Sequence, residues 1–281
     1  MIKNKNWLIA VWEKYIAWRF PYYKTSFAYR HYLRNYRQVL QLRGKTLPVK
    51  LEFRCGIIMT LSNAASSLHI FDEIFVSEDY KLPKSNREKT IVDIGANVGL
   101  FSIYALLKNP KAKIYSIEAD PLVFREFSGN LNVNFLTESI RAFNLAMTSS
   151  VGKNTLYSAQ HSGWSSIFND LGAKNGQPVD VESVNLTRFC ENFNIEKIDY
   201  LKIDIEGAEY DLILGDNTFF KNQIIKMTVE LDKSPRDRRY NYEDLIKKMK
   251  KHYHSIRIVS KSEFYPLLYC SAPRRTGKPV G

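Results

Sequence analysis

From residue 90 onward, short runs of apolar and β-branched residues alternate with longer stretches of helical periodicity. Short apolar runs bounded by polar residues are typical of strands that are buried on both faces. Strands that alternate with helices in this way build a mostly parallel sheet with helices on both faces. The sequence therefore predicts an α/β domain, and in such domains ligands bind at the carboxyl ends of the strands.

The same pattern assigns individual elements to this domain. The predicted strands are 91–94, 113–117, 140–143, 200–203, 225–231, 255–259 and 267–270. The predicted helices are 99–107, 121–131, 186–193, 208–214 and 242–252. The stretch between 143 and 186 is rich in glycine and is interpreted as irregular. A polar segment, 81–89, separates the domain, residues 89–281, from an N-terminal extension, residues 1–88.

A glycine loop follows the first strand of the domain. The strand ends in Asp93, and Gly95 and Gly99 then enclose Asn97. Glycines allow a tight turn and a close approach of backbone to ligand. The spacing differs from the GxGxxG loop that seats a dinucleotide pyrophosphate on a helix N-terminus. S-Adenosylmethionine has no phosphate, and Asp93 and Asn97 offer the carboxylate and amide that such a ligand needs. A glycine turn of an unrelated α/β protein is the alternative.

The second and third strands also end in polar residues. Glu118 follows Gly95 at about the offset at which an acid accepts hydrogen bonds from both ribose hydroxyls. We assign Ala119, Asn144 and Ala146 to the same cofactor site. For Asn144, a contact with adenine and a structural cap of the strand are both open.

Charged residues crowd the end of the fourth strand. Lys202, Asp204, Glu206 and Glu209 are the candidates for catalysis there, and Asp204 is also a candidate cofactor contact. Close carboxylates raise one another's pKa, so one of them can act as a general base. One alternative is that Asp204 holds a divalent cation together with an acid of the fifth strand, Glu230 or Asp232. Another is that Glu206 and Glu209 only favour the start of the next helix.

The glycine-rich stretch contains further candidates. His161 has a pKa range that suits a base, although a lone loop histidine is more often an ordinary polar residue. Trp164 is a candidate for stacking on a sugar, and Ser165 and Ser166 for hydrogen bonds to it. A plain surface loop is equally open.

Residues 90–232 resemble the FkbM-type methyltransferase family. The matching segments are VDIGANVGLFS (92–102), IEADP (117–121), NLA (144–146), GWSSIF (163–168), LKIDIEGAEYD (201–211) and VELD (229–232). The resemblance implies a Rossmann-like sheet of seven strands and S-adenosyl-L-methionine as methyl donor. It implies O-methylation of a carbohydrate, glycan or natural-product acceptor. The residues that it implies as cofactor contacts are Asp93, Gly95, Asn97, Gly99 and Glu118, and those that line the reacting centre are Asp204 and Glu206.

The N-terminal extension carries most of the net charge of +12. Residues 1–50 hold eleven lysines and arginines against one acid, and aromatic residues are interleaved with them. We expect a helical extension with Arg30, Arg34 and Arg37 on one face. Such a segment can cap the catalytic domain, bind a polyanionic glycan, or associate through residues 1–45 with an anionic membrane surface.

The remaining features restrict partners and location. Nucleic acid is disfavoured because the [DNS]PP[YF] and Pro-Cys motifs of nucleic-acid methyltransferases are absent from the sequence. Three sparse cysteines indicate reduced thiols, and we expect no transmembrane helix or secretory signal. The expected location is cytoplasmic, with the inner face of the membrane as an alternative. We assign no metal ligands, and the oligomeric state stays open.

Two other function classes fit parts of the pattern. A nicotinamide-dependent oxidoreductase shares the fold and the acid after the second strand, but the GxxxG spacing disfavours it. A non-catalytic, membrane-associated glycan-binding module with a relict fold is disfavoured by the intact Asp93, Glu118 and Asp204.

Overall fold

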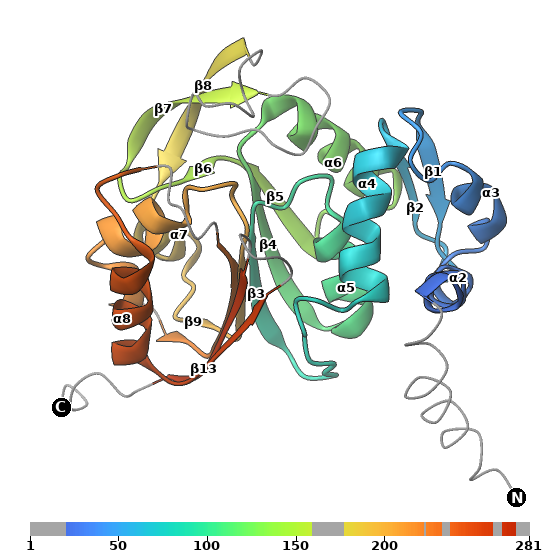
Figure 1. Cartoon of the computed structure of the whole chain (residues 1–281). Helices are drawn as coiled ribbons and strands as arrows, with labels where there is room; N and C mark the ends of the chain where they lie inside the picture. Colours follow the sequence, from blue (N-terminus) through green and yellow to red (C-terminus); the bar gives the residue numbers. More distant parts are fainter. Residues whose placement is uncertain (1–20, 159–176, 222, 232–236, 261–265, 274–281) are drawn as a thin grey trace, which may run out of the picture. The chain divides into compact units, whose positions relative to one another are not determined.

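A computed structural model describes residues 21–158, 177–221, 223–231, 237–260 and 266–273 (Figure 1). The chain forms two compact units, residues 1–79 and 80–281. The predicted boundary lies after residue 88, whereas in the structure residues 80–88 belong to the second unit. Within the described ranges, no helix combines the length and the apolar character that crossing a membrane requires.

The second unit is built on a seven-stranded sheet with the order β13-β14-β12-β10-β3-β4-β5. Its strands are β3 (Lys89–Ile94), β4 (Ala112–Glu118), β5 (Ile140–Asn144), β10 (Tyr200–Ile203), β12 (Lys226–Glu230), β13 (Tyr253–Ser260) and β14 (Pro266–Pro273). The strands from β12 to β5 run parallel, whereas β14 is antiparallel to both of its neighbours. The predicted seven-stranded, mostly parallel sheet is thereby confirmed.

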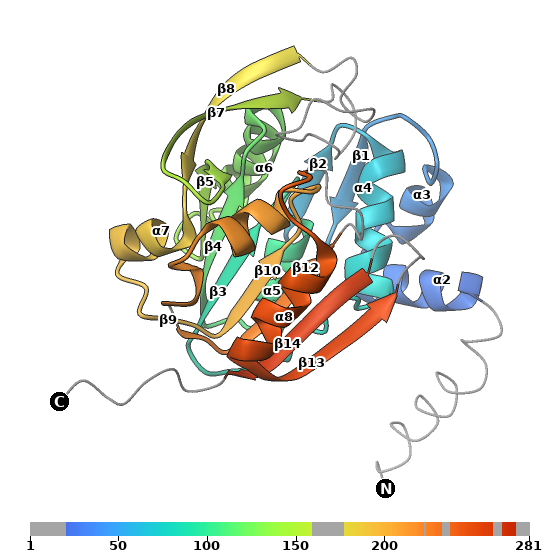
Figure 2. The same ribbon diagram turned by 60° about the vertical axis from the view of Figure 1, so that its left-hand side comes forward.

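Helices cover both faces of this sheet, as predicted. Helices α5 (Leu100–Lys108) and α6 (Pro121–Val133) lie on one face, and α7 (Leu186–Phe193) and α8 (Tyr242–His252) on the other (Figures 1 and 2). Phe189 of α7 and Met249 of α8 share one buried cluster with the central strands. Side chains of Asp120, Asn185 and Asn241 accept hydrogen bonds from first-turn N–H groups, which explains where three of these helices begin.

One local prediction in the second unit is wrong. The stretch interpreted as irregular contains β7 (Gly152–Ser158) and β8 (Gln177–Val184), which pair as an antiparallel hairpin and form a small sheet with β6 (Ala146–Met147). The glycines of this stretch concealed the alternation of its flanking residues. The helix predicted over 208–214 is confirmed, because residues 209–215 are helical and the last five of them form the π-helical segment η3 (Asp211–Gly215).

Three short elements complete the second unit. Strands β9 (Lys197–Ile198) and β11 (Gln223–Ile224) pair in parallel, and η4 (Phe219–Lys221) is one 3-10 turn. They lie between the larger elements and hold no predicted site residue.

The first unit has a core of its own. Its elements are α2 (Pro21–Tyr32), α3 (Tyr36–Gln41), β1 (Val49–Glu52), β2 (Ile58–Leu61), α4 (Ala64–Phe71) and η2 (Asp72–Val76). The expectation of a helical extension is corrected by the β1–β2 hairpin. The expectation that Arg30, Arg34 and Arg37 share one helix face is also wrong. Arg30 lies on α2, which ends at Tyr32, and Arg37 lies on the next helix, α3. Tyr29 is fully buried against Phe71 in this core.

Candidate functional site

The glycine loop joins β3 to α5 at the carboxyl edge of the sheet. All five backbone N–H groups of residues 95–99 already donate hydrogen bonds inside the loop and its neighbours. Their acceptors are the Ile117 carbonyl for residues 95 and 96, the Glu118 carboxylate for 97, the Asn97 side chain for 98 and the Ala96 carbonyl for 99. A loop of this kind offers none of these five N–H groups to a phosphate.

Gly95 brings this loop against the end of β10. It has a φ of +77°, and a Cβ atom built there would lie 1.7 Å from the Asp204 carbonyl oxygen. Gly99 has a φ of +90°, and its Cβ would lie 2.2 Å from the Phe127 ring of α6. Both glycines are therefore required by the backbone conformation and by close approach. The predicted cofactor residues Gly95, Asn97 and Gly99 are thus held in one tight turn.

Glu118 lies at the end of β4 beside this loop. Its Oε2 accepts the Asn97 N–H at 2.8 Å, and its Oε1 accepts the Asp120 N–H at 2.8 Å. Burial raises the pKa of Glu118 to about 7, although these two backbone donors oppose the shift. The side chain is half-buried. Each carboxylate oxygen can accept a second hydrogen bond, so the predicted contact with ribose hydroxyls fits this geometry.

The other three predicted cofactor residues near this edge differ in exposure. Asn144 is exposed, and its Nδ2 donates to the carbonyls of Glu118 and Ala119 at 2.9 Å each. Ala146 is buried in a cluster with Leu156 and Val181 beneath the β7–β8 hairpin. Ala119 packs against the same cluster. Asn144 thus fixes the turn that carries Glu118 and Ala119, which is the structural alternative left open by the sequence.

A buried ion pair lies beneath the glycine loop. Asp93 on β3 and Lys202 on β10 are register partners, and Lys202 Nζ lies 3.4 Å from Asp93 Oδ1. Ser102 Oγ donates to Asp93 Oδ2 at 2.7 Å, and Lys202 Nζ donates to the Gly95 carbonyl at 2.8 Å. Asp93 is fully buried. In this geometry it supports the loop through Lys202, and its predicted direct contact with the cofactor stays a prediction.

The charge state of Lys202 follows from its surroundings. Burial lowers the pKa of Lys202, but the Asp204 and Asp93 carboxylates more than offset this, so the pKa lies above its ordinary value. Burial also raises the pKa of Asp93, against the effect of Lys202. A raised pKa favours the charged ammonium, which cannot accept a proton, so Lys202 does not suit the role of general base.

Asp204 follows β10 and meets two donors. Lys202 Nζ lies 3.3 Å from Asp204 Oδ2, and Tyr80 Oη donates to the same oxygen at 2.8 Å. Tyr80 Oη also lies 3.3 Å from Glu230 Oε2 at the end of β12. No motif or periodicity in the sequence marks Tyr80, so its place in this site was not predicted. Asp204 is the predicted catalytic residue that this arrangement favours most.

Glu206 and Glu209 lie in the turn after β10 and have different surroundings. Glu209 is buried, and its Oε1 accepts the N–H groups of Ile205 at 2.8 Å and Gly207 at 3.3 Å. This gives Glu209 a structural role, and burial raises its pKa to about 7. Glu206 is half-buried and has a left-handed φ of 53°. Of the two, only Glu206 has a partly exposed side chain.

Four predicted residues lie outside the part of the chain that the structure describes. They are His161, Trp164, Ser165 and Ser166, which fall between β7 and β8. Asp232, the alternative metal ligand, is also outside it. Among the residues that are described, no group of three or more His, Cys, Asp or Glu side chains is placed to hold a metal ion.

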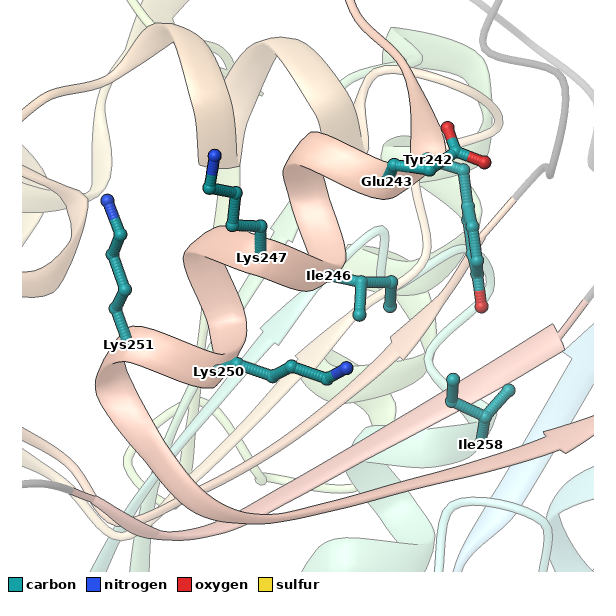
Figure 3. Close-up of a pocket in the computed structure, with 7 residues that line it drawn as sticks. All are labelled: Tyr242, Glu243, Ile246, Lys247, Lys250, Lys251 and Ile258. Atoms are coloured by element: carbon teal, nitrogen blue, oxygen red, sulfur yellow. The ribbon is translucent and has the colours of Figure 1, made fainter.

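One cavity in the described ranges lies away from this site. It has a volume of about 560 Å³ and is formed by α8 and β13, with Tyr242, Ile246 and Ile258 as its apolar side chains (Figure 3). Strand β13 is the far edge of the sheet, three strands from β10. This groove holds none of the predicted site residues.

Comparisons with known proteins agree with the geometry. Methyltransferase sdnD of Sordaria araneosa is 30% identical over 174 residues, which is 52% of this chain and 67% of that protein. Methyltransferase 1 of Beauveria bassiana is 27% identical over 197 residues, 63% of this chain and 79% of that protein. The 2-O-methyltransferase NoeI of Sinorhizobium fredii is 26% identical over 142 residues, 46% of this chain and 57% of that protein.

Solved structures show a more distant likeness. The M. capricolum TrmK complex with S-adenosyl-homocysteine has 16% identity and a TM-score of 0.42, covering 73% of this chain and 70% of that chain. The family described as "Methyltransferase FkbM domain" matches residues 93–256, more than half of the sequence. This protein therefore belongs to the FkbM methyltransferase family, and its methyl donor is S-adenosylmethionine.

Proposed function

We propose that this methyltransferase transfers the methyl group to a hydroxyl of a carbohydrate, glycan or other natural-product acceptor. The observation that carries the proposal is the position of Asp204. Its backbone lies against Gly95 of the glycine loop, and its carboxylate is held by Lys202 and Tyr80. A carboxylate beside the cofactor loop is the group that a hydroxyl nucleophile needs as a base.

The chemistry assigns separate tasks to these residues. The sulfonium of the donor is already activated, so the protein has to align the acceptor oxygen with the methyl group and remove a proton. The acceptor O–H bond and the S–CH₃ bond of the donor would break as the O–CH₃ bond forms, so that S-adenosylhomocysteine leaves and the proton moves to Asp204. Glu118 and the glycine loop hold the ribose and the amino-acid tail. Lys202 Nζ lies 3.3 Å from Asp204 Oδ2 and orients this carboxylate.

The closed hydrogen bonds of the loop argue against the oxidoreductase alternative. A nicotinamide dinucleotide places its pyrophosphate on backbone N–H groups of a glycine loop and helix N-terminus. The five N–H groups of residues 95–99 have other acceptors here. The likeness to the 2-O-methyltransferase NoeI supports oxygen as the methylated atom.

Methyl transfer to extracted material tests the acceptor class. The full chain is incubated with methyl-tritiated S-adenosylmethionine and total carbohydrate extract from cells that lack the protein. We expect label in the carbohydrate fraction, and a loss of at least about 10²-fold in the rate for Asp204→Asn. Glu191→Gln, an exposed carboxylate variant on α7, is the matched control and keeps the wild-type rate. Label that appears only in protein or nucleic acid contradicts the proposed acceptor.

Peripheral membrane association through residues 1–45 is a second proposal. The excess of lysine and arginine in residues 1–50 supports it, because juxtamembrane basic clusters bind anionic lipid. Flotation of the full chain with phosphatidylglycerol vesicles, compared with phosphatidylcholine vesicles, tests it. Equal flotation with the two kinds of vesicle contradicts it.

A further inference from the structure

Tyr80 lies inside the methyl-transfer site, although it stands ahead of every recognised motif. It is the first residue of the second unit and is almost fully buried. Its ring packs edge-on against Phe101 of α5 at 5.3 Å, and the Lys202 ammonium lies 5.3 Å from the ring centre. These contacts fix the plane of the ring between α5 and β10.

The backbone of Tyr80 is fixed as well. Its carbonyl accepts the hydroxyl of Tyr200 on β10 and the hydroxyl of Thr228 on β12, the latter at 3.3 Å. The two hydroxyls also lie 2.7 Å from each other. Burial raises the pKa of Tyr200, so it stays protonated and able to donate. Tyr80 is thus held at both ends, and its hydroxyl position is determined by the fold.

This hydroxyl lies between two carboxylates. Tyr80 Oη is 2.8 Å from Asp204 Oδ2 and 3.3 Å from Glu230 Oε2. A tyrosine hydroxyl has one hydrogen and can accept as well as donate. It can therefore donate to one carboxylate while it accepts from the other when that one is protonated. Among the residues that the structure describes, Lys202 faces them, with its Nζ at 3.3 Å from Asp204 Oδ2.

We propose that Tyr80 is a positioning residue that orients the Asp204 carboxylate and passes its proton to Glu230. The proposal rests on the proposed function, in which Asp204 takes the proton of the acceptor hydroxyl. The O–H bond to Asp204 then breaks as one forms to Tyr80 Oη, and the original Tyr80 hydrogen moves to Glu230. Tyr80 is neutral before and after, Asp204 is ionised again, and Glu230 carries the proton.

The arrangement explains why two carboxylates lie near one reacting centre. Asp204 remains next to Lys202, which favours its ionised form. Glu230 is on the neighbouring strand β12, on the other side of Tyr80. The relay thereby returns the base to its active form, and the half-buried Glu230 releases its proton to solvent before the next transfer.

Carbon-13 NMR of the tyrosine ring tests the shared proton. The full chain is labelled at the tyrosine Cζ, and the Tyr80 signal is assigned by its loss in Tyr80→Phe. Between about pH 4 and 8 we expect this signal to shift with carboxylate ionisation. Asp204→Asn and Glu230→Gln each move the midpoint of the shift. If Tyr80→Phe does not fold, the two carboxylate variants assign the signal, because they leave the other tyrosine signals unchanged.

The matched control is Tyr253→Phe, which removes a buried hydroxyl that donates to the Ile224 carbonyl away from the carboxylates. With the labelled donor and the carbohydrate extract, we expect Tyr80→Phe to lower the methyl-transfer rate at least tenfold and to change its pH profile. Loss of the general base itself would cost about 10²–10⁴-fold. Tyr253→Phe changes neither the rate nor the pH profile.

The NMR and rate measurements distinguish failure of the Tyr80 relay from failure of the proposed methyl transfer. A Tyr80 signal that ignores pH, or that responds to only one of the two carboxylate variants, overturns the relay. So does an unchanged pH profile in Tyr80→Phe. If the wild-type chain binds S-adenosylmethionine in calorimetry and labels carbohydrate, such a result leaves the proposed function intact. Absence of both in the wild type contradicts the proposed function itself.

Discussion

Lys202 is the residue at which the charges of the site converge. Its ammonium is buried and contacts the Gly95 carbonyl, the Asp93 carboxylate and the Asp204 carboxylate. A buried cation needs such partners, because an unpaired charge in the interior costs several kcal/mol. One side chain therefore holds the glycine loop, neutralises the buried acid of β3 and orients the proposed base.

Removal of this cation is expected to destabilise the fold strongly. Lys202→Met leaves Asp93 as an uncompensated buried charge, and the free energy of unfolding should fall by about 3–5 kcal/mol in urea titrations at pH 7. Adding Asp93→Asn to the same chain should restore part of this loss. Lys197→Met removes a half-exposed lysine that pairs with Asp199 and should cost less than about 1 kcal/mol. A double variant no more stable than Lys202→Met would show that the pair is not coupled.

Glu209 should make the stability of the protein fall as pH rises. Its pKa is raised by burial to about 7 from an ordinary value of 4.5, so the folded state keeps a proton that the unfolded chain releases. Both states hold this proton below pH 4.5, stability falls between 4.5 and about 7, and the full cost is present above 7. From pH 5 to 8, the wild type should lose roughly 1–3 kcal/mol more than Glu209→Gln.

The measurement is urea unfolding at several pH values. Glu118 titrates in the same range and stays in both proteins, so the difference between the two curves isolates Glu209. Glu191→Gln, an exposed carboxylate on α7, should keep the wild-type slope. Parallel curves for the wild type and Glu209→Gln would mean that Glu209 is ionised in the folded protein at pH 5.

At the scale of elements, the site depends on how closely the β3–α5 loop approaches the end of β10. The two strands are parallel neighbours, and Asp204 N–H donates to the Ile94 carbonyl just beyond the paired residues. Gly95 then turns the chain against the Asp204 carbonyl. This approach places the cofactor loop and the proposed base side by side.

A side chain at Gly95 should separate these elements. Gly95→Ala forces a methyl group to 1.7 Å from a backbone oxygen at a φ of +77°. We expect it to cost at least about 2 kcal/mol of stability and to weaken S-adenosylmethionine binding more than tenfold. Gly129→Ala on α6 meets no atom within 4 Å and should raise stability by about 0.5–1 kcal/mol. Chemical unfolding and calorimetry check both variants, and normal binding by Gly95→Ala contradicts the close approach.

Elements with strong periodicity and clear caps were predictable from the sequence. The bounds of α7 and α8 agree with prediction because Asn185 and Asn241 cap an apolar stripe. The β7–β8 hairpin was not predictable, because glycines outweighed its short alternating runs. The glycine loop and Glu118 were predictable as a candidate site from the spacing of Gly95, Gly99 and Glu118 in the sequence. The burial of Asp93 and the position of Tyr80 beside Asp204 could not be predicted, because both depend on which strands become neighbours.

The whole molecule combines two units with separate cores. The first unit buries its own aromatic residues, including Tyr29, Phe53 and Phe71, and the second builds all of the described site from residues 80–230. The positive charge concentrates in residues 1–50, ahead of the catalytic unit. The described residues of the candidate site therefore belong to the second unit.

Titration calorimetry of the full chain with S-adenosylmethionine is the most direct test of a cofactor site at the glycine loop and Glu118. Glu118, with a pKa near 7, must be ionised to accept both ribose hydroxyls. We expect S-adenosylmethionine to bind at pH 8, to bind roughly tenfold more weakly at pH 6, and to lose this pH dependence in Glu118→Gln. We expect no binding of NAD. Absence of S-adenosylmethionine binding at pH 8, or binding of NAD that Glu118→Gln abolishes, would contradict this cofactor site.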